Sequence, residues 1–203
     1  VIAGGGTGGH VTPALALGEV IAQRGEKVLF IGSEQGLESR LVPAAGFELL
    51  ALPSQQVMGR GLAGRILGTL GTLGQVARAR RALRAHRAHV VISVGGFAAL
   101  PAALAAGTTN CPLALVEPNA IPGRANRLTA RFARRVFVGF PEAGQRLGDR
   151  TPSEHRGIPL RRALVDAFEP HAPRGVPETP LHLLVFGGSQ GARQINEAMM
   201  TLA

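Results

Sequence analysis

Short apolar runs alternate with longer helical stretches over the first two thirds of the chain. The runs are at most eight residues long. They are bounded by Gly, Pro or polar turns, and this combination favours buried strands over helices. Strands are predicted at residues 1–3, 28–32, 48–52, 90–94, 113–116 and 136–138. Helices are predicted between them at 13–24, 36–45, 66–87, 97–106 and 124–132. Continuous apolar strands separated by helices indicate an α/β fold with a parallel sheet and flanking helices.

The segment 88–116 carries no Asp, Glu, Lys or Arg and could be taken for a membrane span. Gly95, Gly96, Pro101, Gly107 and Pro112 interrupt it, however, and residues 108–110 form a polar turn. A strand, a short helix and a second strand explain these interruptions better than a bilayer-spanning helix does.

The composition changes from Pro141 onward, because seven of the 14 prolines lie between Pro141 and Pro180. This density predicts a linker or irregular crossover, followed by a strand at 181–186 and a helix at 192–200. We therefore expect an N-terminal domain at 1–160 and, at 161–203, a linker with the first βα unit of a second domain whose remainder is absent. Residue 1 already lies in an apolar run, so we also expect a trimmed N-terminus and can identify no secretory signal.

Composition excludes several classes of protein. With 45% hydrophobic and 17% charged residues, the 203-residue chain is globular. Eight Phe and no Trp or Tyr leave few stacking platforms, which argues against a nucleic-acid partner. Cys111 is the one cysteine, so a disulfide scaffold is excluded and a small core residue is expected. The histidines show no ligand spacing with carboxylates, and no metal is expected.

The net charge is +9, and its distribution is uneven. Between Leu49 and Val116 there is no Asp or Glu, whereas seven Arg occur. Such a surface attracts anions, which could be nucleic acid, anionic lipid or a phosphorylated substrate. The alternative is an ordinary solvated helix face.

Three predicted strand-to-helix turns carry paired glycines, at 1–10, 91–97 and 183–192. Glycine lets the backbone approach a ligand, and the following helix start offers free N–H groups and a partial positive charge. One such turn could serve only helix–strand packing. Three at the carboxyl ends of parallel strands indicate a phosphate-rich ligand.

The first turn also satisfies a dinucleotide-binding spacing, G-x-G-x-x-G, at Gly4, Gly6 and Gly9, with Glu34 as a ribose-binding acid. A glycine tract meets this pattern easily by chance. A nicotinamide-dependent oxidoreductase would also leave the second glycine turn unexplained, together with the basic tract, the arginine-containing segment between Leu49 and Val116. His10 ends the turn, where the helix dipole keeps an imidazole neutral and able to accept a proton. Its alternative role is to cap the helix.

Five segments occur in the order and rough spacing of a known family: GGGTGGH, VGGF, EPN followed by PG and AN, G-x-P-x-R and GGSQGA. They resemble the MurG family of bacterial N-acetylglucosaminyltransferases, which have a GT-B fold of two Rossmann-like domains. The resemblance implies inverting, metal-independent transfer of GlcNAc from UDP-GlcNAc to the MurNAc 4-hydroxyl of lipid I (undecaprenyl-pyrophosphoryl-MurNAc-pentapeptide), without a cofactor. The product is lipid II, a peptidoglycan precursor, and the family is peripheral on the cytoplasmic face of the inner membrane.

The resemblance also assigns site residues. His10 is implied as the base. Glu117, beside Asn119, is implied as a supporting residue, and orienting the loop is favoured for it over direct catalysis. The implied substrate contacts are Thr7, Gly8, Gly9, Gly95, Gly96, Asn119, Arg161, Ser189, Gln190 and Gly191. Val116 and Ile158 depart from the family, which often has His and usually has Asn there, so the acceptor contacts are less certain than the rest.

The basic tract gains a partner from this resemblance, because apolar residues among arginines suit docking onto anionic lipid. The expected membrane-facing residues are Ile66, Leu67, Leu70, Arg78, Arg80, Arg81 and Arg84. Val76 and Leu83 are expected on the core face of the same helix. A non-catalytic, phosphate-binding module at the membrane surface remains a further alternative.

Overall fold

The structure, a computed structural model, describes residues 1–53, 62–148, 152–168, 183–187 and 192–202; of residues 62–70 it describes the helical backbone alone. The chain divides into two compact units, Val1–Arg162 and Ala163–Ala203, and each is described by itself.

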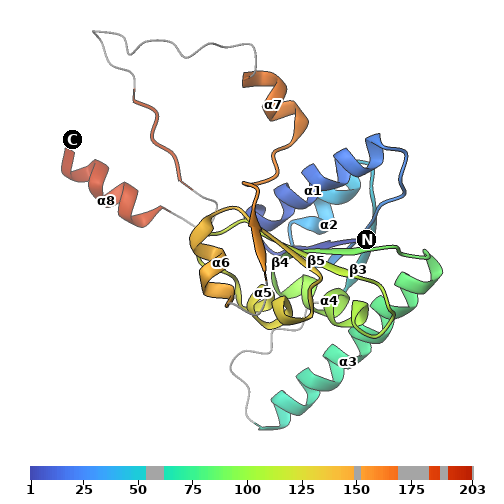
Figure 1. The fold of residues 1–203 in the computed structure, drawn as a ribbon. Coiled ribbons are helices and arrows are strands. Elements are labelled where there is room, and N and C mark those ends of the chain that lie inside the picture. Colours follow the sequence, from blue (N-terminus) through green and yellow to red (C-terminus); the bar gives the residue numbers. More distant parts are fainter. Residues whose placement is uncertain (54–61, 149–151, 169–182, 188–191, 203) are drawn as a thin grey trace. The chain divides into compact units, whose positions relative to one another are not determined.

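The first unit is built on one parallel sheet, in agreement with the predicted Rossmann-like architecture (Figure 1). In the described part of the chain the strand order is β3-β2-β1-β4-β5-β6-β7, and every neighbouring pair is parallel. The strands are β1 (Ile2–Gly4), β2 (Leu29–Ser33), β3 (Glu48–Leu52), β4 (Val91–Gly95), β5 (Leu113–Glu117), β6 (Arg135–Val138) and β7 (Ser153–His155). The chain thus builds outward from β1 in one direction, then returns to the other side of β1 with β4.

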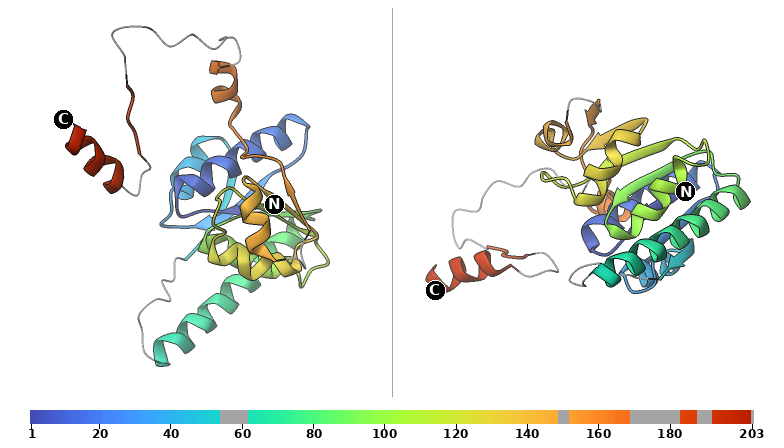
Figure 2. Two further views of the ribbon diagram at one scale, coloured as in Figure 1. Left: turned by 60° about the vertical axis from the view of Figure 1, so that its left-hand side comes forward. Right: turned by 90° about the horizontal axis from the view of Figure 1, so that it is seen from below.

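Helices cover both faces of the sheet (Figures 1 and 2). The core on one face holds residues of α1 (Gly8–Gln23) and α2 (Glu38–Ala44). The core on the other face holds residues of α3 (Leu62–Ala85), α4 (Leu100–Ala106) and α6 (Pro141–Leu147). The 3₁₀ turn η1 (Phe97–Ala99) precedes α4, and α5 (Arg124–Thr129) is followed by the turn η2 (Ala130–Phe132).

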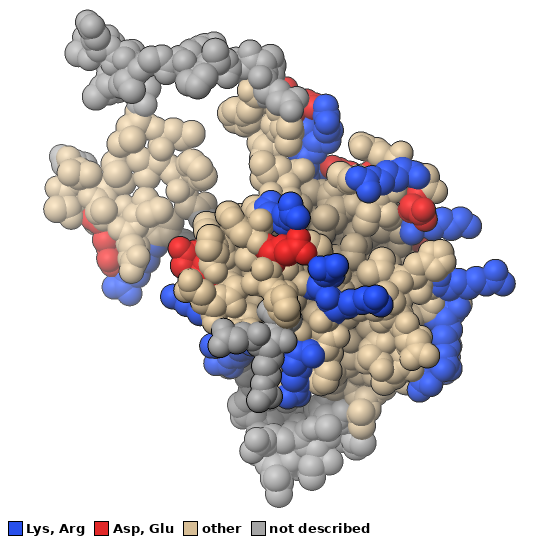
Figure 3. Space-filling model, viewed as in Figure 1, with Lys and Arg blue, Asp and Glu red and all other residues tan. Residues whose placement is uncertain are grey.

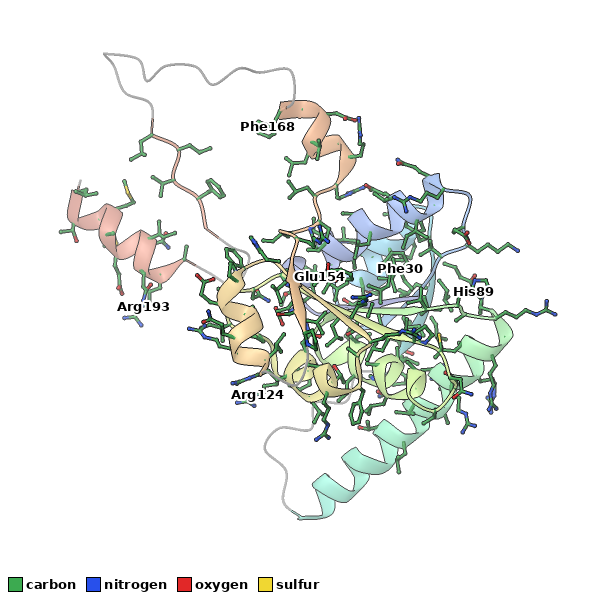
Figure 4. The ribbon with its side chains drawn as sticks, viewed as in Figure 1. Phe30, His89, Arg124, Glu154, Phe168 and Arg193 are labelled. Carbon is green, nitrogen blue, oxygen red and sulfur yellow. The ribbon has the colours of Figure 1, made fainter. Side chains whose placement is uncertain are left out.

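Side chains of the strands β1 to β6 alternate between these two cores, as the pleat of a strand requires. In β2, Phe30 packs with the α1–α2 core, whereas Leu29 and Ile31 pack on the opposite side. Figure 4 shows Phe30 enclosed among the strands and helices, while His89 and Arg124 point outward. The Phe30 ring contacts Phe47, and α1 approaches both through Gly18, where a Cβ would lie 2.8 Å from Phe30. The buried strands are therefore apolar on both faces.

Two predictions about element boundaries in the first unit are wrong. α1 begins at Gly8 rather than at Pro13, so Pro13 lies inside the helix and removes one internal hydrogen-bond donor. The first part of the predicted linker, up to residue 155, contains α6 and the edge strand β7, whereas its residues 169–180 lie outside the described residues. Pro141 occupies the first helical turn of α6, where its missing N–H costs nothing.

The second unit contains α7 (Arg162–Phe168) and α8 (Arg193–Leu202). The first residue of α7, Arg162, is the last residue of the first unit. The predicted strand at 181–186 is not formed where the structure describes it, since residues 183–187 have no regular structure. Leu183, Leu184 and Phe186 are 76%, 81% and 78% exposed. A strand is stable only when a neighbour pairs its backbone groups, and an apolar sequence alone does not provide that neighbour.

The segment 88–116 forms β4, η1, α4 and β5, which confirms its interpretation as strand, helix and strand. None of the described helices combines the length and the apolar character that crossing a bilayer would require.

Candidate functional site

The strand order reverses between β1 and β4, and two glycine turns meet at this point. Gly4 pairs with Gly95 in the register of the two strands, and the amide of Gly5 donates to the carbonyl of Gly95 at 3.4 Å. Gly95 and Gly96 have φ values of +101° and +81°, which side chains rarely adopt, and a Cβ on Gly96 would overlap the carbonyl oxygen of Gly5. In open α/β sheets, ligands bind at this reversal, beyond the carboxyl ends of the strands.

Helix α1 starts directly at this reversal of the strand order. Thr7 is its N-cap residue, with φ −121° and ψ 159°, and its hydroxyl makes no cap hydrogen bond to the helix. The N–H groups of a first helical turn have no acceptor within the helix and carry its partial positive charge. A Cβ on Gly8 would meet nothing within 4 Å, and Gly9 is exposed. This turn is therefore open to an anionic group.

His10 lies in the same turn, and its two ring nitrogens have different surroundings. Its Nδ1 lies 3.1 Å from Oγ1 of Thr7, whereas Nε2 is buried without a hydrogen-bond partner among the described residues. Burial lowers the pKa of His10 below its ordinary value of 6.5, and the carboxylates of Glu117 and Glu38 oppose that effect. The imidazole is therefore neutral near pH 7, and the nitrogen that faces the turn is Nδ1.

Glu117, at the end of β5, is fully buried and organises the loop that follows. Its Oε1 accepts from the backbone and side-chain amides of Asn119, both at 2.9 Å. Its Oε2 accepts from the Gly123 amide and from Nδ2 of Asn126, also at 2.9 Å. Four donors on two oxygens leave no free lone pair directed at a substrate, so the carboxylate orients Asn119 rather than taking part in proton transfer.

Asn126 is a site residue that the sequence reasoning missed. It is 1% exposed, and its Nδ2 donates to Glu117 while Oδ1 has no partner among the described residues. A Cβ on Gly95 would lie 3.0 Å from Nδ2 of Asn126 and 3.1 Å from Cδ2 of His10, so Gly95 separates the two side chains. Its place in the AN pair that follows EPN and PG was the available signal, because the polar character of the helix Arg124–Thr129 does not single it out.

Glu38 is the second residue that was missed, and it changes the interpretation of the first glycine turn. Its Oε2 accepts from the amide of Gly6 at 2.8 Å, so this amide already has an anionic partner. Glu34, predicted as a ribose-binding acid, is exposed and donates its amide to the carbonyl of Leu52. The dinucleotide interpretation requires an open Gly6 and is not favoured.

Arg161 does not reach the glycine turns in this structure. Its guanidinium pairs with Glu19, three turns along α1, with Nε 2.8 Å from Oε1. The substrate contacts predicted for Ser189, Gln190 and Gly191 lie outside the described residues, as do the side chains of Ile66, Leu67 and Leu70.

The C-terminal half of α3 is strongly basic. Arg78, Arg80, Arg81 and Arg84 are all exposed, whereas Leu83 is buried and Val76 packs against the core, as predicted. Figure 3 shows Lys and Arg widely distributed over the face that it views, with Asp and Glu confined to a few places. Where the structure describes the chain, no three His, Cys, Asp or Glu side chains gather as a metal site would need.

Comparison with known proteins gives consistent matches. Residues 1–138 match the glycosyltransferase family 28 N-terminal domain. A relative from Pelobacter propionicus is 39% identical over 98% of this chain and 58% of its own length. It is named UDP-N-acetylglucosamine--N-acetylmuramyl-(pentapeptide) pyrophosphoryl-undecaprenol N-acetylglucosamine transferase. A relative of the same name from Anaeromyxobacter dehalogenans is 41% identical over 97% of this chain and 51% of its own length.

Among solved structures, the crystal structure of MurG from Acinetobacter baumannii matches with a TM-score of 0.72 and 28% identity. The match covers 97% of this chain and 54% of that protein. The chain thus spans about half the length of the curated relatives that it matches.

Proposed function

The chain belongs to glycosyltransferase family 28, and from this membership we propose that the protein containing it transfers GlcNAc from UDP-GlcNAc to the MurNAc 4-hydroxyl of lipid I. The observation that carries the proposal is the meeting of two glycine turns, an open helix start and a neutral imidazole at the β1–β4 reversal. Family membership and the names of the relatives give the substrates, and the geometry supports the chemistry.

The reaction breaks the bond between C1 of GlcNAc and the β-phosphate oxygen of UDP, and forms a bond between C1 and the acceptor oxygen. Negative charge grows on the departing diphosphate. The first-turn amides of α1, at Gly8 and Gly9, present hydrogen-bond donors and a partial positive charge, and such preorganised groups stabilise developing charge. The Gly95–Gly96 turn lies beside this turn and is proposed to contact the diphosphate of the lipid acceptor.

The acceptor hydroxyl must lose its proton as it attacks. We assign the base to Nδ1 of His10, reached through the hydroxyl of Thr7 at 3.1 Å. The acceptor proton passes to Oγ1 of Thr7 while the Thr7 proton passes to Nδ1, and Nε2 keeps its own hydrogen. Because Nε2 is enclosed beside Gly95, this route uses the ring nitrogen that faces the turn.

The remaining described site residues orient groups rather than react. Glu117 fixes the amide of Asn119, which is exposed and proposed to contact the donor sugar. Arg161 is proposed to exchange Glu19 for the donor diphosphate on binding, and Ser189 with Gln190 and Gly191 to contact UDP.

We also propose that the protein docks on the cytoplasmic face of the bacterial inner membrane. The support is the exposed arginines of α3 together with an acceptor whose lipid chain lies in that membrane. Basic side chains near an anionic surface each add about 1 kcal/mol of attraction.

The test uses the complete protein with radiolabelled UDP-GlcNAc and lipid I in detergent. We expect labelled lipid II and release of one UDP for each sugar transferred. His10→Ala should lower kcat by about a hundredfold with little change in the Kd for UDP-GlcNAc. Thr7→Val should resemble His10→Ala, whereas Thr7→Ser should retain activity. Absence of labelled lipid II would refute the proposed reaction, and full activity of Thr7→Val would remove the relay alone.

A parallel measurement tests the oxidoreductase alternative. NADH and NADPH should bind no more tightly than an unrelated nucleotide does. Tight, stoichiometric binding of either cofactor would instead favour the dinucleotide interpretation.

A further inference from the structure

Glu38 is a buried carboxylate that the proposed chemistry leaves unused. It is the first residue of α2 and is 1% exposed. Its Oε1 accepts from the amide of Ser33 at 2.7 Å, and its Oε2 accepts from the amide of Gly6 at 2.8 Å. One side chain thus joins the end of β2 to the first glycine turn.

Three glycines make room for this carboxylate. A Cβ on Gly5, Gly32 or Gly36 would in each case overlap side-chain atoms of Glu38. None of the three has a positive φ, so their lack of a side chain is explained by space and not by backbone conformation. Moving the carboxylate aside to make room for a Cβ would cost its two amide hydrogen bonds.

We propose that Glu38 is a positioning residue: its carboxylate takes the anion position inside the first glycine turn and so directs the amides of Gly8 and Gly9 at the substrate diphosphate. The inference rests on the proposed function for the identity of that diphosphate. The arrangement of the turn itself does not depend on it.

The charge distribution supports these separate roles for the Glu38 carboxylate and for the amides of Gly8 and Gly9. Each oxygen of the carboxylate accepts a backbone N–H, so its charge is partly offset locally and the open helix start two residues later stays attractive to phosphate. Its field still reaches His10, where it acts with Glu117 to raise a pKa that burial lowers more strongly. A turn with an empty anion position would instead bind phosphate at Gly6.

The first experiment measures the turn by NMR in the 203-residue chain and needs no activity. An amide that donates to a carboxylate resonates downfield, and Glu38→Gln keeps the side-chain volume while replacing one acceptor oxygen with a donor. We expect the Gly6 and Ser33 amide protons of Glu38→Ala to shift upfield and their exchange to rise about tenfold. Unchanged Gly6 and Ser33 resonances in both variants would overturn the proposal.

A double-mutant cycle measures the space that the glycines provide. Gly36→Ala should destabilise the wild-type chain but should cost much less in a Glu38→Ala background, where the overlap is absent. Gly74→Ala on α3 is the matched control, since a Cβ there meets nothing within 4 Å, and its effect should be equal in both backgrounds. An equal cost of Gly36→Ala in both backgrounds would also overturn the proposal.

The functional readout uses the complete protein. Glu38→Gln should raise the Kd for UDP about tenfold, because a displaced helix start no longer directs its amides at the diphosphate. A purely structural role would lower the unfolding midpoint and leave the Kd of the folded protein unchanged, which would overturn the positioning role. If wild-type protein fails to form lipid II yet binds UDP through this turn, the proposed reaction fails while the role of Glu38 stands.

Discussion

Oε2 of Glu117 lies 2.9 Å from Nδ2 of Asn126, and this buried contact joins the end of β5 to the helix that faces His10. The two residues are nine positions apart, and both are almost completely buried. Through them the loop that carries Asn119 is fixed to the same point of the sheet as the second glycine turn. The site is therefore held from β1, β4 and β5 together.

Replacing Glu117 by Gln should destabilise the first unit by about 2 kcal/mol, because an amide cannot accept all four hydrogen bonds and leaves buried donors unpaired. Urea unfolding of the 203-residue chain measures the effect. Glu154→Gln is the control, since its ion pairs with Arg135 and Arg156 are exposed and should contribute less than 1 kcal/mol. A cost for Glu117→Gln as small as that of the control would show that the network is not rigid.

His10 should make stability fall at mildly acidic pH. Because burial lowers its pKa below 6.5 in the folded state, the unfolded chain takes up a proton first as the pH decreases. Stability is thus full above pH 6.5 and is lost as the pH falls toward the folded pKa. The difference in unfolding free energy between wild type and His10→Gln should shrink over that interval and be constant above it. A difference that does not vary with pH would contradict a buried, neutral imidazole.

Gly96→Ala should cost at least about 2 kcal/mol, since it combines an unfavourable φ of +81° with overlap of the Gly5 carbonyl. Thermal unfolding of the purified chain checks this. A wild-type midpoint for Gly96→Ala would mean that the two glycine turns do not touch as described.

The Glu19–Arg161 ion pair should compete with the donor. In the complete protein, Glu19→Gln frees Arg161 and should lower the Kd for UDP-GlcNAc about threefold, whereas Arg161→Ala should raise it. Isothermal titration calorimetry distinguishes the two directions. If wild type and both variants bind UDP-GlcNAc with equal affinity, Arg161 does not contact the donor, and its role is limited to the ion pair with Glu19 on α1.

Neutralising Arg78, Arg80, Arg81 and Arg84 with Gln should weaken binding of the complete protein to phosphatidylglycerol vesicles by about a hundredfold at low salt. The loss should shrink as salt rises, because exposed charges are screened. A control with Gln at Arg24, Lys27, Arg40 and Arg156 removes the same charge elsewhere and should retain most of the binding. Equal losses in the two variants would indicate a general charge effect and no docking surface on α3.

The sequence by itself determined the parallel sheet and the position of its glycine turns, because both depend on neighbours along the chain. A short, continuously apolar run such as 113–116 needs both faces of its strand covered, and paired glycines such as Gly95–Gly96 readily adopt the positive φ values that a tight turn requires. The resemblance of five segments to a known family predicted the family of this chain, and the match of residues 1–138 to the glycosyltransferase family 28 N-terminal domain confirmed that prediction. The sequence did not predict α6 and the edge strand β7. The high density of proline indicated a linker, although one of these prolines, Pro141, lies in the first turn of α6, where proline is favourable.

Only the tertiary structure decided which polar groups meet. Glu38 and Gly6 are 32 positions apart, and Arg161 and Glu19 are 142 apart, so no local pattern predicts either contact. The fold brings Glu38 into a space that three separate glycines leave free, while it places Nε2 of His10 beside Gly95 and Nδ1 beside Thr7. Local propensity selects strands and turns, but a buried charge is placed by the donors that the whole fold gathers around it.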